Sequence, residues 1–109
     1  MPKKCGVAIK VTRDHIENGE PEDTNQCAIA LAVKEAFGIE DVSVGGEIQV
    51  GNMTFKNSKE VNTFIRNFDT KGVVEDEYFT KEERKPFIEK FKKAKPFTLY
   101  LTNGRAIAG

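Results

Sequence analysis

Cys27 is the residue whose type and position point most directly to chemistry. The apolar run from Cys27 to Val33 predicts a buried helix that has the thiol in its first turn. Unpaired backbone N–H groups and the helix dipole favour an anion at that position, so they lower the pKa of a thiol and activate it. His15 is the single histidine of the chain and the candidate base. The pair therefore raises the hypothesis of a thiol-dependent hydrolase or transferase that uses Cys27 with His15.

The alternative interpretation makes Cys27 a small buried hydrophobic residue. The three residues that follow it are all apolar, and Leu31 lies one helical turn away on the same face. Residues 16–26 separate His15 from the thiol, and most of them belong to the predicted loop at 13–23, so the spacing does not bring the two side chains together. These observations favour a structural Cys27 and a protein that is not an enzyme.

A basic run is the second candidate site. Residues 84–95 carry six basic side chains and one acidic side chain, a net charge of +5, with three large apolar residues interleaved. A helical face of this kind can track nucleic-acid phosphates, or dock on an acidic protein or a membrane surface. The alternative is a solvated helix whose lysines balance the acidic stretch at 73–83. The basic residues are Arg84, Lys85, Lys90, Lys92, Lys93 and Lys95.

The charge of the whole chain narrows the choice of partner. The 109 residues include 17 Lys and Arg and 17 Asp and Glu, so the formal net charge is zero, which disfavours nucleic acid and anionic membranes. Trp is absent and Tyr occurs twice, so aromatic platforms for stacking bases are few. No apolar run approaches the ~18 residues of a spanning helix. We therefore expect a protein partner, with a nucleic-acid-binding module as the alternative.

The expected binding site combines the basic run with Glu75, Asp76 and Glu77, because both segments lie outside the apolar periodicity of the core. The acidic residues of 14–23 lack the spacing of a calcium-binding loop, so no metal site and no cofactor are expected. Two cysteines are too few for a disulfide framework, and no signal peptide is visible, which predicts a cytoplasmic protein with free thiols. The pattern predicts no particular oligomeric state.

The elements that must position these residues follow from the apolar periodicity. Alternating side chains predict a strand at 5–12, and acidic and turn-forming residues predict a loop at 13–23. A helix capped by Asp23 or Thr24 should then run through the apolar stretch and end at Gly38.

The second half of the chain begins with short strands joined by glycine-containing turns over 42–56. Apolar residues at helical spacing predict an amphipathic helix over 57–69. Thr80 and the glutamate three residues later form a capping box for a further helix, which Pro86 should kink or restart.

A strand is predicted at 96–102, because its apolar and hydroxyl-bearing residues alternate. Its outward side chains would be Thr98, Tyr100 and Thr102, which could offer hydroxyl groups to a ligand, or could be exposed residues chosen for strand propensity. An Asn-Gly turn follows, and 105–109 would form a return strand or a frayed tail.

Together these elements predict a single α+β domain over residues 1–109. The sheet should be small, antiparallel or mixed, with about five short strands, and two to three helices should cover one of its faces. The first and last strands are expected beside each other or beside the glycine-turn strands.

Four short motifs carry a resemblance that spans most of the chain. They are VTRDHIENG at 11–19, CAIALA at 27–32, FIRNFD at 64–69 and PFTL at 96–99. They resemble a set of small uncharacterised proteins from bacteriophages and actinobacterial genomes, which typically have Cys-Pro where this chain has Cys27-Ala28. Those proteins lack residues 75–92, so the segment 75–95 is interpreted as a charged helical insertion. The resemblance implies a small, intracellular, phage-borne context and not an activity. A phage context suggests a protein that acts on a host protein or host defence component by occlusion.

Overall fold

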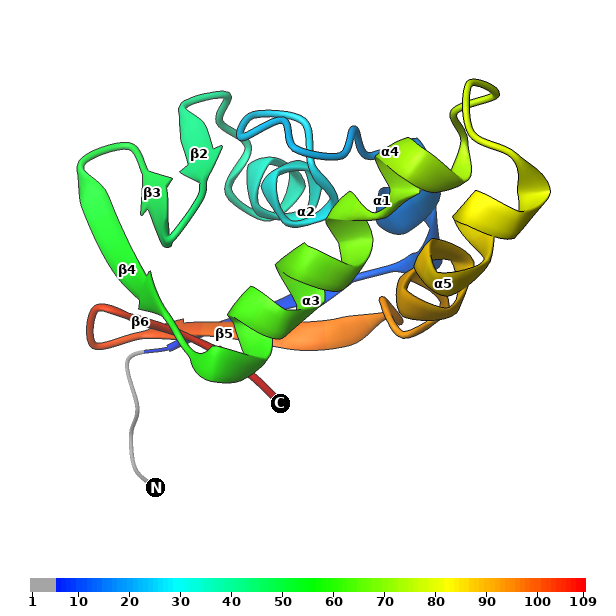
Figure 1. Cartoon of the computed structure of the whole chain (residues 1–109). Coiled ribbons are helices and arrows are strands. Elements are labelled where there is room, and N and C mark those ends of the chain that lie inside the picture. The colour runs from blue at the N-terminus through cyan, green and yellow to red at the C-terminus, as the bar shows by residue number, and fades with distance from the viewer. Residues whose placement is uncertain (1–5) are drawn as a thin grey trace.

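The fold is built on one curled sheet that carries helices on a single face (Figure 1). The computed structural model describes residues 6–109, so Cys5, at the start of the first predicted strand, lies outside the described residues. The strands follow the spatial order β1-β5-β6-β4-β3-β2. The elements are β1 (Val7–Val11), α1 (Arg13–Asn18), α2 (Ala28–Phe37), β2 (Val42–Val44), β3 (Glu47–Val50), β4 (Met53–Asn57), α3 (Lys59–Asp69), α4 (Lys71–Val74), α5 (Lys81–Lys92), β5 (Phe97–Thr102) and β6 (Arg105–Ala108). This arrangement confirms the predicted α+β class and makes the sheet mixed.

β1 pairs with β5 in antiparallel register, which places the first and last predicted strands side by side. Ile9 lies opposite Leu99, and both side chains are buried beneath the helices. The residues that alternate with these along each strand face away from the helices, and Tyr100 is 40% exposed on that face. The same alternation puts Thr98 and Thr102 on this outward face.

β6 completes a hairpin with β5, so residues 105–108 form a strand and not a frayed tail. Asn103 (φ 49°) and Gly104 (φ 74°) adopt the left-handed conformation that a two-residue turn of this kind requires. On its other side β6 meets β4 in a parallel pairing of two residue pairs, which begins with Lys56 opposite Arg105. This short ladder joins the two halves of the sheet.

β2, β3 and β4 form the predicted meander and make up the second half of the sheet. Gly51 has a φ of 58° in the turn between β3 and β4, where a side chain would be strained. Figure 1 shows this half rising at a steep angle from the half formed by β1, β5 and β6. The helix α2 packs against strands of both halves, β1 and β2, and so fills the angle between them.

α2 is the central helix of the core, as its apolar sequence predicts. Five of its ten side chains are buried, and it ends at Gly38 in the left-handed conformation. Its N-cap is Cys27, so the predicted caps Asp23 and Thr24 are wrong. The Asp23 carboxylate instead accepts two backbone N–H groups within the preceding turn, at 2.9 and 3.1 Å, and the helix begins after that turn.

The predicted loop at 13–23 is wrong over its first six residues, which form α1. Thr12 and His15 make a capping box: the N–H of His15 donates to Thr12 Oγ1 at 3.3 Å, and the N–H of Thr12 donates to His15 Nδ1 at 2.9 Å. Ile16 is fully buried and anchors this short helix to the core. In this capping box the side chain of His15 accepts the N–H of the N-cap residue, the role that Glu or Gln usually has.

α4 places a buried lysine against the end of α1. Lys71 is 5% exposed. Its Nζ donates hydrogen bonds to the carbonyl oxygens of Ile16, Glu17 and Gly19, at 3.1, 2.7 and 2.8 Å. The last carbonyls of a helix have no partner within the helix, so the ammonium group satisfies acceptors that α1 leaves open. Lys71 thus fastens α4 to α1.

α5 packs on α3 through aromatic side chains, with the ring centroids of Phe91 and Phe68 6.4 Å apart. The predicted capping box is confirmed, because the N–H of Glu83 donates to Thr80 Oγ1 at 3.1 Å and the N–H of Thr80 donates to Glu83 Oε1 at 2.8 Å. Pro86 does not restart the helix, since α5 is continuous across it. The basic run therefore occupies one unbroken helix and the residues that follow it.

Candidate functional site

Cys27 lies at the start of α2, in surroundings that keep its thiol neutral. Its side chain is 7% exposed, and Sγ accepts the backbone N–H of Ala30 at 3.5 Å. Burial raises the pKa of the Cys27 thiol, and the N–H groups of Ala30 and Ile29 oppose that rise without cancelling it. The N–H groups at the helix start therefore do lower the pKa of the thiol, but by less than burial raises it.

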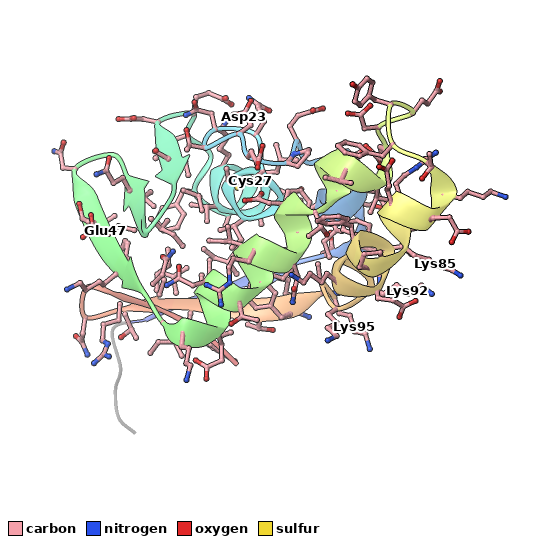
Figure 2. The ribbon with its side chains drawn as sticks, viewed as in Figure 1. Asp23, Cys27, Glu47, Lys85, Lys92 and Lys95 are labelled. Carbon is pink, nitrogen blue, oxygen red and sulfur yellow. The ribbon has the colours of Figure 1, made fainter. Side chains whose placement is uncertain are left out.

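A pocket of about 340 Å³ lies beside the thiol, between the loop before α2 and helix α3. Glu22, Asp23 and Asp69 line it, and Figure 2 shows Asp23 on the loop next to Cys27. Asp69 Oδ1 accepts the N–H of Glu22 at 2.9 Å, while burial, together with the smaller effect of the Glu22 charge, raises the pKa of Asp69. The charges of Asp69 and Asp23 further raise the pKa of the thiol, so this pocket disfavours a thiolate.

Both ring nitrogens of His15 are engaged away from Cys27. Nδ1 accepts the N–H of Thr12, so Nε2 carries the proton of the neutral ring and donates to Glu35 Oε1 at 2.7 Å. These contacts join α1 to α2, and in the described part of the chain no hydrogen bond links His15 to the thiol. Within residues 6–109 no group of three or more His, Cys, Asp or Glu side chains is arranged to hold a metal ion.

Five exposed lysines of the basic run form what we name the lysine face. Figure 2 shows Lys85, Lys92 and Lys95 extending outward from α5 and the segment that follows it. Lys92 lies 3.6 Å from the carboxylate of Glu89, and it is the one member of the lysine face with an ion-pair partner within residues 6–109. The lysine face is Lys85, Lys90, Lys92, Lys93 and Lys95.

Arg84, the remaining predicted basic residue, is turned toward the protein. Its guanidinium donates to the carbonyl oxygens of Phe79 and Val74, at 3.0 and 3.3 Å, and the side chain is half-buried. These bonds fasten the start of α5 to the loop before it. Arg84 therefore has a structural role, and the five lysines are the exposed cations of the basic run.

Glu75, Asp76 and Glu77 lie on the exposed loop that precedes α5. Asp76 Oδ1 accepts the N–H of Tyr78 at 2.9 Å, and the Tyr78 side chain is 88% exposed. Lys90 to Lys95 lie at the opposite end of α5, which at 1.5 Å per residue is about 18 Å long. Four of the six predicted basic residues therefore lie at the end of α5 away from the acidic loop, and no ion pair joins the acidic and basic segments among the described residues.

A groove of about 260 Å³ lies beside the lysine face, and sequence reasoning did not find it. Helix α3 forms one wall, and the segment that leads into β5 forms the other. The rings of Phe64 and Phe97, with centroids 4.7 Å apart, lie at its base, and Lys93 and Lys95 line it. Glu60, Thr63 and Asn67 follow helical spacing along α3, and this polar stripe was the one available sequence signal.

The outward face of the sheet carries a further pocket of about 390 Å³. It holds two of the predicted outward residues, Tyr100 and Thr102, together with Ile107. Ile107 is 37% exposed, so this face presents apolar as well as hydroxyl-bearing side chains. Thr98 is not among the residues that line this pocket.

Comparisons of the chain with protein-family models, curated proteins and solved structures found no match. In the part of the chain that the structure describes, no helix has both the length and the apolar character needed to cross a membrane. The function must therefore be inferred from the charge and geometry of the molecule itself. The relevant features are the charged residues on and around α5, the thiol pocket and the groove.

Proposed function

We propose that this protein is a small non-enzymatic binding protein whose lysine face docks on an acidic surface of a protein partner. The proposal rests on the five exposed lysines that extend along α5 and into the segment after it, of which Lys92 alone has an ion-pair partner within the described residues. Ammonium groups gathered on one surface repel one another, and an anionic partner would relieve this repulsion. On the basis of the resemblance to phage and actinobacterial proteins, we propose that the partner is a host protein or host defence component. The protein would bind this partner in the host cytoplasm and occlude it.

Three properties favour a protein partner over nucleic acid. The chain has no net charge, so no long-range field draws it to polyphosphate. Phe64 and Phe91, two rings beside the lysine face, pack toward the core and do not form a platform on which bases could stack. The acidic loop at 75–77, at the other end of α5, would repel a polyanion that extended along the helix.

The thiol-enzyme alternative has less support. A nucleophilic cysteine needs a thiolate and an available base. Cys27 is held neutral by burial and by two nearby carboxylates, and His15 is engaged with Thr12 and Glu35. A binding role therefore agrees better with the contacts of both residues.

Fluorescence anisotropy with two labelled polyanions tests the proposal. The probes are polyglutamate of about 20 residues, which represents an acidic protein surface, and single-stranded DNA of about 20 nucleotides. The double variant Lys93→Glu and Lys95→Glu reverses two exposed charges on the lysine face. The matched control, Lys56→Glu and Lys81→Glu, makes the same change in net charge at exposed positions that do not line the groove.

Polyglutamate is expected to bind, and the Lys93/Lys95 variant should weaken its binding about tenfold, since each exposed charge contact contributes up to about 1 kcal/mol. The control variant should change the affinity less than about threefold. Equal losses in the two variants, or no binding of polyglutamate, would contradict the proposal. DNA binding about tenfold tighter than polyglutamate binding would support the nucleic-acid alternative instead.

A further inference from the structure

Resting on the function proposed above, we infer that the groove beside the lysine face receives one large apolar side chain from the acidic segment of the partner. The expected occupant is a peptide segment in which an apolar residue is flanked by Asp or Glu. The lysines would then supply attraction to acidic segments in general, and the groove would select among them.

The base of the groove is apolar and closely packed. Phe64 is 8% exposed, and its ring meets the ring of Phe97 at an interplanar angle of 53°. Ala108 and Pro96 complete the apolar lining. A side chain that enters the groove would therefore leave water for contact with aromatic and aliphatic carbon, which is the main source of favourable free energy for apolar burial.

The rim of the groove is cationic on one side. Lys93 and Lys95 line the wall opposite α3, and neither has an ion-pair partner within residues 6–109. Glu60 is the one carboxylate of the lining, and Thr63 and Asn67 add neutral polar groups. A ligand that matches this groove would place an apolar group on the apolar base. It would also place carboxylates beside that group, next to the two lysines at the rim.

The size of the groove agrees with a single side chain as its occupant. Its volume of about 260 Å³ lies below the range of about 300–1,000 Å³ that is usual for pockets of drug-sized ligands. In an extended segment, successive residues are about 3.3 Å apart. Successive side chains of such a segment point to opposite faces, so carboxylates two residues before or after the anchor, about 6.6 Å away, would point with it toward the long, flexible side chains of Lys93 and Lys95.

Two acidic peptides of equal charge separate the groove from the lysine face. One has the sequence Asp-Glu-Leu-Asp-Glu and the other Asp-Glu-Gly-Asp-Glu, and both carry a fluorescent label at the N-terminus. The leucine peptide is expected to bind the wild-type protein about fivefold more tightly, because only it can bury an apolar side chain. Anisotropy titration at low salt measures both affinities.

A variant that fills the groove provides the structural test. Thr63→Phe places a ring at the wall of the groove and leaves the lysines unchanged, so it should abolish the preference for leucine without weakening the glycine peptide. Thr54→Phe makes the same substitution at an exposed strand position outside the groove and should keep the preference. Circular dichroism confirms that both variants are folded.

The outcomes separate this inference from the proposed function. If both peptides bind equally and Lys93→Glu with Lys95→Glu weakens both, the groove has no role and the proposed function stands. If neither peptide nor polyglutamate binds, both proposals are overturned. If the protein instead self-associates in sedimentation equilibrium and Tyr78→Ala abolishes this, the occupant is the acidic loop of a second copy, and the inference of an acidic partner peptide is overturned.

Discussion

Lys71, His15 and Cys27 are three side chains whose polar groups bond within the fold and stabilise its helices. The ammonium of Lys71 satisfies three carbonyls at the end of α1, and the ring of Phe68 lies 5.7 Å from its Nζ. The imidazole of His15 caps the start of the same helix and reaches Glu35 on α2. The thiol of Cys27 caps α2. At the residue scale, groups that a sequence reader takes for catalysts can be helix caps.

Replacing Lys71 with Met should destabilise the protein by about 2–4 kcal/mol. Methionine keeps the aliphatic length of the lysine stem, but leaves the carbonyls of Ile16, Glu17 and Gly19 without their donor in a buried setting. Urea denaturation measures the change in the free energy of unfolding. Lys85→Met, at an exposed position, serves as the control and should change stability by less than about 0.5 kcal/mol. Equal effects of the two changes would show that the three bonds contribute nothing.

Alkylation of Cys27 should be slow at neutral pH and should speed up only at alkaline pH. Burial and nearby carboxylates raise the pKa of this thiol, so the folded protein holds the neutral form beyond the pH at which an exposed thiol ionises. The experiment uses a Cys5→Ser background, iodoacetamide and mass spectrometry, with and without urea. Unfolding should accelerate the reaction about a hundredfold or more at pH 7.5.

The same raised pKa gives a pH dependence of stability with a definite sign. Because the folded state binds the thiol proton more tightly than the unfolded chain does, the contribution is fully present below the ordinary thiol pKa. It is lost as the pH rises through the higher, folded-state pKa. Rapid alkylation of folded protein at pH 7.5 would contradict both statements and revive the thiol-enzyme alternative.

At the scale of elements, strong apolar periodicity in α3 and a standard capping box in α5 were enough for prediction, whereas the histidine cap of α1 was not. In α3, Val61, Phe64 and Phe68 are buried at the spacing the sequence displays, and that helix was predicted. The six residues of α1 contain a single buried side chain, Ile16, and their cap uses histidine in place of Glu or Gln. Their helical state depends on contacts with α2 and Lys71, which are distant in sequence.

The candidate site was predictable in part for a related reason. The lysine face lies in one continuous segment, so composition revealed it. The groove joins α3 to Pro96, Phe97 and Ala108, which come together only when α3 packs beside β5 and β6. Sequence reasoning also grouped Arg84 with the lysines, because charge alone does not reveal that its guanidinium bonds Phe79 and Val74.

Pro86→Ala should stabilise α5. Pro86 occupies an exposed interior position of a continuous helix, where it lacks the N–H that would donate to the carbonyl of Glu82. Alanine restores that donor, and the expected gain in the free energy of unfolding is about 1–3 kcal/mol. Urea denaturation provides the measurement. A loss of stability would mean that the packing of Phe91 on Phe68 requires the local geometry that proline imposes.

At the scale of the whole molecule, a neutral chain separates its charges in space. Acidic groups line the thiol pocket and occupy the loop at 75–77, whereas four lysines gather at the end of α5 away from that loop. The sheet is divided as well, because two residue pairs join its halves. The protein therefore presents surfaces of opposite charge on a sheet that is divided into two halves.

Hydrogen exchange should detect the division of the sheet. Amides of β5, which is paired on both sides and carries the fully buried Leu99, should exchange most slowly. Amides of β3 are also paired on both sides, but their half is held by the short ladder between β4 and β6, so they should exchange about tenfold faster. Equal rates in β3 and β5 would show that the sheet opens as one unit.

The pairing of β1 with β5 sets an order of events during synthesis on the ribosome. Val7 pairs with Leu101, so β1 leaves the ribosome long before its partner strand β5 exists. At about 5–20 residues per second, this interval lasts roughly 5–20 s. During that time the meander can close on its own turns, while the apolar side chains of Ile9 and Val11 stay without their native cover. Nascent chains that still lack β5 are therefore the form of this protein on which chaperones and proteases have the most time to act.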